Sequence, residues 1–200
     1  MTQEVLSKFI STQTEREEKI KLLEDKFQEI LDILEIKKPS TEKTPQRIAR
    51  MYIDELFYGL DKNNFPKLCM EDAPNQELIV VRKIRVKSLC EHHFLPFEGY
   101  ADIAYLPNQK IIGLSKINRI VDYFCKRPQL QEGLTEEIAQ CLKDSLETPH
   151  LAVFIRAKHF CVSMRGIEDE CSYTETQKTM GAFENDHELR QIFFQKTHSF

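Results

Sequence analysis

The sequence predicts an α+β fold in which helices precede a β-β-α-α-β-β unit built on an antiparallel sheet. Three observations support it. Apolar residues recur at spacings of three and four up to about Leu56, which is typical of amphipathic helices. From Glu77 the apolar period changes to two, which is typical of half-buried strands. Two amphipathic helical segments separate the first pair of strands from the second.

The first predicted helix, over residues 14–36, carries an apolar stripe. Thr14 and Glu17 form a capping box, and the stripe then follows helical spacing through Ile20, Leu23, Phe27, Ile30 and Leu34. Such a stripe must pack on this chain or on a neighbour, and we expect a neighbouring subunit. Lys37, Lys38 and Pro39 end the helix, so residues 1–40 are predicted to be an N-terminal helical extension.

A second helix and the first strand follow. Thr44 and Pro45 begin the helix as a cap residue and a proline at the first helical position. The helix ends near Gly59. A strand with a kink or bulge is predicted from Glu77, because apolar residues there alternate irregularly with Arg82, Lys83, Arg85 and Lys87.

The remaining elements complete the unit. Residues 99–106 form a strand and lead to a short segment over 110–114. Ser115 is expected to cap a helix that Pro128 closes, and a longer amphipathic helix covers residues 129–147. Three further elements are predicted: the longest strand over 151–166, a strand near 172–179, and a final helix capped by Asp186.

Composition excludes several classes of protein. The net charge of −4, from 28 basic and 32 acidic residues, gives no overall positive field for nucleic acid. The six glycines form neither GxGxxG nor GxxxxGK[ST], which excludes Rossmann and P-loop phosphate sites. The apolar runs are too short to cross a bilayer. We therefore expect no nucleic-acid or membrane partner, and any anion site must be local.

The N-terminus, MTQEVLSKFI, lacks the basic and apolar regions of a signal peptide. Six cysteines without an export signal predict a reduced, cytoplasmic chain whose thiols are buried, reactive or metal-bound. A disulfide framework is the weaker interpretation.

The first chemical cluster is Cys90-Glu91-His92-His93. Cysteine and histidine at C-x2-H can reach one metal ion from a single turn, and thiolate with imidazole favours zinc. The alternative is a buried thiol beside two surface histidines.

A second cluster, His159-Phe160-Cys161, lies late in the long predicted strand. Residues at i and i+2 of a strand share a face. The pattern therefore places a polar set on one face, comprising His159, Cys161, Ser163 and Arg165. It places an apolar set on the other, comprising Phe154, Phe160, Val162 and Met164.

Cys90, His93 and Cys161 make three ligands, since adjacent His92 and His93 usually point apart. A catalytic zinc keeps three protein ligands and an open position, whereas a structural zinc takes four. His159 is then either a fourth ligand or a free base beside the metal. Spacing alone leaves both interpretations open.

A candidate anion site lies where the 110–114 segment leads into the next helix. Ser115, Lys116 and Arg119 follow Gly113, and a helix N-terminus attracts phosphate. Arg165 could join them. Separately, Glu132 after Gln131 could accept two hydrogen bonds from the N1–H and amine of guanine. The alternatives are solvated surface charges and an exposed glutamate at a helix start.

Four segments resemble the GTP cyclohydrolase I family, in order between about Thr44 and Gly181: SLCEHHFLPFEG, IIGLSKINRIVDYF, RPQLQEGLTEEI and HFCVSMRG. The resemblance implies the tunnelling (T-) fold, in which β-β-α-α-β-β units assemble into a barrel. It also implies a toroidal homodecamer with active sites between neighbouring subunits. Residues 41–200 would then form the catalytic T-fold domain.

The resemblance also implies a role for each candidate residue. Cys90, His93 and Cys161 would hold a catalytic Zn2+, with His159 as the general acid/base at the purine N7 and His92 assisting. Glu132, supported by Gln131, would read guanine, and Ser115 would lie by the ribose and phosphates. The triphosphate would be bound by Lys116, Arg119, Arg165 and, from TPQR, Arg47.

The implied reaction opens the imidazole ring of GTP by hydrolysis at C8 and releases formate. After an Amadori-type rearrangement it yields 7,8-dihydroneopterin triphosphate, the first step of tetrahydrofolate and pterin biosynthesis. The segment ECSYTETQKT departs from the family's usual Ser/Thr-rich stretch, which bears on the local strand and the subunit contacts. The cysteines outside the two clusters are interpreted as packing or incidental thiols: Cys69, Cys125, Cys141 and Cys171.

Two other hypotheses stand beside the enzyme. One is a non-catalytic, zinc-stabilised oligomeric scaffold in which His159 is the fourth ligand. The other is a T-fold relative of different chemistry, such as the deazaguanine nitrile reductase. That family depends on a nucleophilic cysteine and a nicotinamide cofactor.

Overall fold

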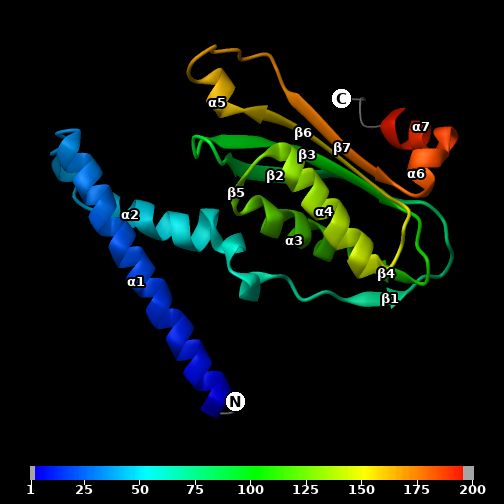
Figure 1. The fold of residues 1–200 in the computed structure, drawn as a ribbon, viewed down its shortest axis with the longest axis horizontal. Coiled ribbons are helices and arrows are strands. Elements are labelled where there is room, and N and C mark those ends of the chain that lie inside the picture. Colours follow the sequence, from blue (N-terminus) through cyan, green and yellow to red (C-terminus); the bar gives the residue numbers. More distant parts are fainter. Residues whose placement is uncertain (1–2, 196–200) are drawn as a thin grey trace. The chain divides into compact units, whose positions relative to one another are not determined.

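The computed structural model describes residues 3–195 (Figure 1). It divides into two compact units, Met1–Tyr58 and Gly59–Phe200. The division falls further along the chain than the boundary expected at residue 40. Residues 41–58 therefore belong to the first unit by their contacts, and the assignment of 1–40 as an extension stays a prediction.

In the N-terminal unit a long helix packs on a shorter one. Its elements are α1 (Gln3–Ile33), η1 (Pro39–Thr41), α2 (Thr44–Met51) and the π-helical turn η2 (Tyr52–Leu56). Phe27 of α1 stacks on Tyr52 with ring centroids 5.6 Å apart. Part of the predicted apolar stripe is used here, since Ile20 is 2% exposed, whereas Ile30 is 45% exposed.

The start of α1 differs from the prediction. The helix begins at Gln3, so Thr14 lies inside it and is not its cap. The physical reason is that residues 3–33 contain no glycine or proline. Residues that suit a cap can also continue a helix when nothing interrupts it. The expected second helix is present as α2, but Thr44 is its first helical residue and Lys43, not Thr44, occupies the cap position.

The second unit is built on a five-stranded sheet of order β5-β2-β3-β6-β7 (Figure 1). Its strands are β2 (Ile79–Cys90), β3 (Pro96–Tyr105), β5 (Pro128–Gln129), β6 (Leu151–His159) and β7 (Thr174–Met180). All pairings are antiparallel except the short β2–β5 pair. This confirms the predicted α+β class with an antiparallel sheet.

A separate two-stranded ribbon joins β1 (Met70–Asp72) to β4 (Lys110–Ile112). The sequence indicates the second of these strands but not the first. The turns η3 (Tyr58–Leu60) and η4 (Lys62–Asn64) precede β1.

Helices cover both faces of the sheet. The main core lies between the sheet and α3 (Leu114–Cys125) with α4 (Gln131–Leu146), and β6 contributes Leu151, Val153, Ile155 and Ala157 to it. The alternate residues Ala152 and Phe154 face α6 (Ala182–Asn185) and α7 (His187–Gln195). Asp186 caps α7 as predicted, since its Oδ1 accepts from the Leu189 N–H at 3.0 Å.

The predicted kink in the first strand is a β-bulge between Val81 and Ile84. Lys83 lies there in the left-handed region, with φ 54°. The buried Asp102 carboxylate secures the bulge, accepting from the Lys83 N–H at 2.8 Å and from Arg82 Nη1 at 3.0 Å. Arg82 also donates to the Phe193 carbonyl on α7 at 3.2 Å.

Two predictions near the site are corrected. Gly113, and not Ser115, occupies the cap position of α3, because β4 ends at Ile112 and the chain turns at Gly113. The long strand ends at His159 instead of Gly166. Beyond His159 neither β3 nor β7 offers a partner in the register, and the chain forms one helical turn, α5 (Phe160–Ser163). The Met164 N–H then bonds to the Phe160 carbonyl at 3.0 Å.

Among the described residues, no helix combines the length and apolar character of a membrane span.

Candidate active site

The site is built first from the turn that follows β2. The Cys90 N–H bonds to the Leu95 carbonyl at 2.9 Å, and the Phe94 N–H bonds back to the Cys90 carbonyl at 2.8 Å. Phe94 adopts φ 53°, which lets the chain reverse within this short span. The reversal brings the His93 side chain back over Cys90, at the end of the sheet where β3 begins.

Cys161 reaches the same place from β6. Phe97 of β3 pairs with His159, so the end of β6 lies beside the start of β3. The helical turn α5 then carries Cys161 toward the turn after β2. One ligand atom from each of Cys90, His93 and Cys161 lies within 4.8 Å of the others. The expected juxtaposition is therefore present, although a helical turn produces it and not the strand parity that predicted it.

The three side chains differ in exposure. Cys90 is buried, Cys161 is half-buried and His93 is exposed. Burial, and then the neighbouring Cys90 thiol, raise the pKa of Cys161. Two adjacent thiols repel when both ionise, and a cation between them removes that repulsion. Two sulfurs with one imidazole are donors that suit zinc, so the residues fit the expected metal.

His159 lies beside this group and is not part of it. Its ring stacks on Phe97, with centroids 4.8 Å apart and planes 12° from parallel. Its Nε2 lies 2.8 Å from Gln131 Oε1. Burial lowers the pKa of His159, and the nearby negative charge of Glu132 opposes that effect.

The other predicted residues at this end of the sheet are His92, Arg165 and Glu132. The Nδ1 of His92 lies 3.9 Å from the Cys90 sulfur, and its ring lies 6.1 Å from that of His93. Arg165 Nη1 donates to His93 Nε2 at 3.2 Å, since arginine only donates. Glu132 is exposed at the start of α4. A single chain thus gathers three histidines and two thiols, with the Arg165 guanidinium and the Glu132 carboxylate nearby.

Ser115, Lys116 and Arg119 lie elsewhere. The C-terminal end of α3 is the end near Cys90, because the residues just after it, 128–129, pair with Leu89 and Cys90. Ser115 is near the other end of this 12-residue helix, which spans about 18 Å. In Figure 1 the chain enters α3 from β4 and leaves it toward β5, at opposite ends of the unit.

Within residues 13–195, no hydrogen bond or ion pair joins Ser115, Lys116 or Arg119 to Cys90, His93 or Cys161. Arg47 is exposed on α2, in the N-terminal unit. The structure of one chain therefore brings together the predicted metal and proton-transfer residues and Arg165, but not Ser115, Lys116 or Arg119.

Sequence reasoning missed three side chains that support His159. Phe97 provides the stacking surface, and Thr135 and Thr176 bond to each other at 2.7 Å beside Gln131. The i, i+4 spacing of Gln131 and Thr135 is a weak signal that they share a helix face. Nothing local connects either residue to Thr176, because β7 lies far along the chain.

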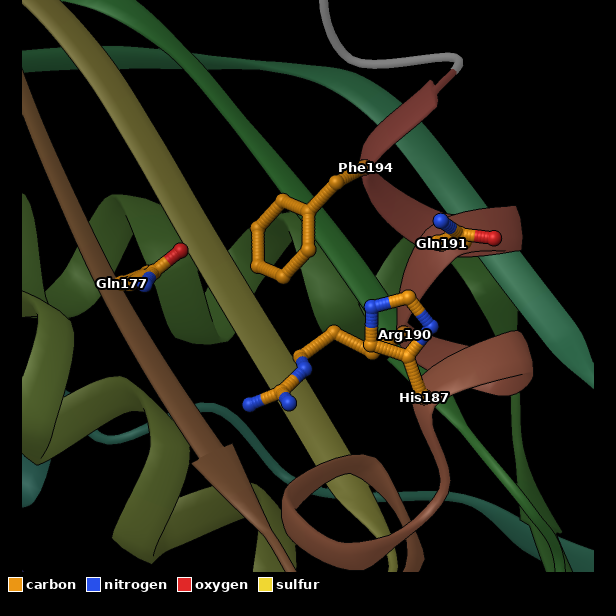
Figure 2. A pocket seen from close by; sticks show the side chains of 5 residues that line it. All are labelled: Gln177, His187, Arg190, Gln191 and Phe194. Atoms are coloured by element: carbon orange, nitrogen blue, oxygen red, sulfur yellow. The ribbon is translucent and has the colours of Figure 1, made fainter.

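A pocket of about 300 Å³ elsewhere in this unit contains no predicted site residue (Figure 2). Its lining comes from β7 and α7: Gln177, His187, Arg190, Gln191 and Phe194. Gln177 pairs with Phe154, on the sheet face opposite His159 and roughly 17 Å away along β6. The pocket is separate from the Cys-His-Cys group.

The fold and the site define a class: an α+β protein with a Cys-His-Cys group able to hold a metal ion and a histidine next to it. The sequence pattern of the GTP cyclohydrolase I family matches residues 23–198. The chain belongs to the GTP cyclohydrolase I family.

Several curated relatives agree. The GTP cyclohydrolase 1 of Buchnera aphidicola subsp. Schizaphis graminum is 48% identical over 165 residues, covering 82% of this chain and 76% of the relative. That of Blochmanniella pennsylvanica is 49% identical over 162 residues, covering 80% and 73%. That of Shewanella denitrificans is 47% identical over 189 residues, covering 92% and 87%.

One solved structure, the archaeosine synthase QueF-Like in the apo form, aligns with a TM-score of 0.42 at 19% identity. The alignment covers 55% of this chain and 96% of that chain. This likeness is too low to support an inference about the fold or the activity.

Proposed function

We propose that this chain is a GTP cyclohydrolase I that opens the imidazole ring of GTP by hydrolysis at C8. The products are formate and 7,8-dihydroneopterin triphosphate. The observation that carries the proposal is the Cys90, His93 and Cys161 group within 4.8 Å, with His159 oriented beside it, in a chain of this family. The reaction is hydrolytic and needs no redox cofactor.

The resident metal in this proposal is Zn2+, held by Cys90, His93 and Cys161. When bound, zinc supplies Lewis acidity that activates water at neutral pH. The thiols are free in the structure, and keeping them so suits a reducing compartment, so we propose a cytoplasmic enzyme.

The protein residues act on the proton and the base. His159 gives a proton to the purine N7 as the C8–N bond is broken, and its half-buried ring is held for that transfer. His92 lies close enough to Cys90 to assist proton transfer. Glu132 reads the N1–H and amine of guanine through its two carboxylate oxygens.

The phosphate residues imply an assembly. Ser115, Lys116 and Arg119 lie toward the end of α3 away from Cys90, so a triphosphate bound by them would extend from the metal group of another subunit. We propose the T-fold barrel and homodecamer of the family, with each site shared between neighbours. Arg165 would bind the same triphosphate from the metal side, and Arg47 would add to it from α2.

The test is incubation of the zinc-loaded protein with GTP, with formate and the fluorescent oxidised pterin measured together. Both should form in equal amounts, and a metal-loaded preparation that forms neither would refute the proposal.

His159→Ala separates the enzyme from a structural zinc scaffold. Since His159 already bonds to Gln131 and is outside the three-residue group, we expect zinc content to stay and turnover to fall by about 100-fold or more. Loss of zinc from this variant would instead identify His159 as a fourth ligand.

A further inference from the structure

Gln131 is 1% exposed, and both polar atoms of its side-chain amide have hydrogen-bond partners within the protein. Its Nε2 lies 3.1 Å from the Ile155 carbonyl, 3.1 Å from the Thr174 carbonyl and 3.0 Å from Thr176 Oγ1. Its Oε1 lies 2.8 Å from His159 Nε2. Both polar atoms of this amide are therefore hydrogen-bonded within the protein, and the residue is buried in the chain.

These contacts fix which way the amide points. Two of the three atoms around Nε2 are backbone carbonyl oxygens, which only accept hydrogen bonds. The amide nitrogen must therefore face β6 and β7, and Oε1 must face His159. Because Oε1 only accepts, the hydrogen in this bond belongs to His159 Nε2.

The threonines beside Gln131 close a ring of hydrogen bonds. Thr135 Oγ1 donates to the Gln131 carbonyl at 2.8 Å, so its single hydrogen is used. In the 2.7 Å contact between the two hydroxyls, Thr176 must then be the donor. Thr176 in turn accepts from Gln131 Nε2. Each bond in the ring runs in the same sense, which strengthens the others and resists a flip of the amide.

We propose that Gln131 is a positioning residue that holds His159 through Nε2–H and leaves Nδ1 as the nitrogen that exchanges the proton. This inference rests on the proposed role of His159 in the ring opening. It revises the expectation from the sequence that the Gln131 side chain supports the reading of guanine, and it leaves that task to Glu132. Phe97 completes the support, since stacking on one face limits tilting of the His159 ring.

Gln131→Met tests the proposal, because methionine has a similar length and no strong acceptor for His159. We expect kcat to fall by about 100-fold, the scale expected when a reacting group is misplaced by about 1 Å. The KM for GTP should change by less than about threefold, because the proposed guanine contact is untouched. A tenfold rise in KM with kcat retained would overturn the proposal and return Gln131 to substrate binding.

Crystal structures of the zinc-loaded wild type and Gln131→Met provide a readout that does not depend on activity. In the variant we expect the His159 ring to leave its position over Phe97 or to occupy two orientations. A ring that stays in the wild-type position would overturn the positioning role even if turnover changed. If the wild type did not convert GTP, the proposed function would fail while this structural comparison would still decide what Gln131 holds.

Two further variants guard against a misfolded protein. Thr176→Val breaks the ring of hydrogen bonds but keeps the Gln131 to His159 contact, so kcat should fall severalfold with KM unchanged. Unaltered kcat in this variant would show that the ring does not support Gln131. Gln140→Met is the matched control on the same helix, because Gln140 is exposed and its side chain bonds to Asp144. Gln140→Met should match the wild type in kcat and KM. The zinc content should be equal in the wild type and in all three variants. Loss of zinc from Gln131→Met alone would contradict the proposal that Gln131 acts through His159.

Discussion

The two ends of the sheet unit differ in what one chain can complete by itself. At the Cys90 end, a turn after β2, the start of β3 and the helical turn after β6 bring three metal-binding side chains within 4.8 Å. At the other end of α3, Ser115 and Lys116 place hydroxyl and ammonium groups near a helix start, and the metal-binding group of the described residues lies at the Cys90 end.

The metal-binding side chains come together in one chain because strand pairing joins segments that are remote in sequence. Cys90 and Cys161 are distant in sequence, yet β2 and β6 both pair with β3 in one sheet and carry their segments to the same end of it. Lys116 follows β4, which pairs with β1 in a separate ribbon, and the length of α3 separates Lys116 from the Cys90 end. A shared site between subunits would join the two ends without any rearrangement of the fold.

We expect the largest loss of turnover from substitution of a metal-binding residue at the Cys90 end of the sheet. Cys161→Ala leaves two of three ligands, and we expect loss of bound zinc and a fall in turnover of at least about 1,000-fold, as for loss of an essential activating group. Elemental analysis and formate release measure the two effects. Cys171→Ala is the matched control, because Cys171 is exposed and outside the group. Retention of zinc by Cys161→Ala would remove Cys161 from the site.

Zinc binding by the same group should weaken as the pH falls. The Cys161 thiol must lose its proton to bind zinc, and burial raises its pKa, so protons compete with the metal up to a higher pH than at a free thiol. The apparent zinc affinity should therefore increase with pH across the neutral range. Competition with a chelator at several pH values measures this, and an affinity independent of pH would contradict thiolate ligation.

Substitution of Lys116, at the Ser115 end of α3, should reduce activity less than loss of a metal ligand does. Co-expression with a second variant subunit should restore that activity. Lys116→Ala should raise the KM for GTP about tenfold or more, because it removes a charged hydrogen bond. Subunits carrying Lys116→Ala and subunits carrying His159→Ala should each be poor enzymes. Co-expressed, they should regain activity if a site takes Lys116 and His159 from different chains.

The control for that experiment is co-expression of His159→Ala with Cys161→Ala. Both residues belong to one end of one chain, so no combination of these subunits should restore a site. Recovery in this pair, or no recovery with Lys116→Ala, would contradict the proposed division of the site between subunits.

The smallest expected effect lies on the sheet face that carries α7, away from both ends. Asp102→Asn removes the charge that receives the Arg82 and Lys83 hydrogen bonds, which should lower the free energy of unfolding by about 1–3 kcal/mol. Denaturant unfolding measures it, and kcat per folded subunit should be unchanged. A large loss of kcat would show that the bulge influences the site.

Much of the fold could be predicted because its periodicities are local. The alternation after Glu77, the irregularity at Lys83 and the cap at Asp186 each depend on a few adjacent residues, and the structure confirms them. The cap expected at Thr14 is wrong, because the same residue types also occur inside an unbroken helix. The strand expected to reach Gly166 is wrong for a different reason, since its end depends on where the neighbouring strands end.

Which residues can bind a metal follows from the amino-acid sequence alone, because thiol and imidazole groups have that chemistry wherever they lie. The family follows from the sequence as well, through four motifs in order along the chain. That Gln131 contacts His159, and that Ser115 is far from Cys90 along α3, becomes visible only in the folded chain. Those relations are distances between segments that are remote in sequence, and they are set by strand pairing and helix length, which no local pattern encodes.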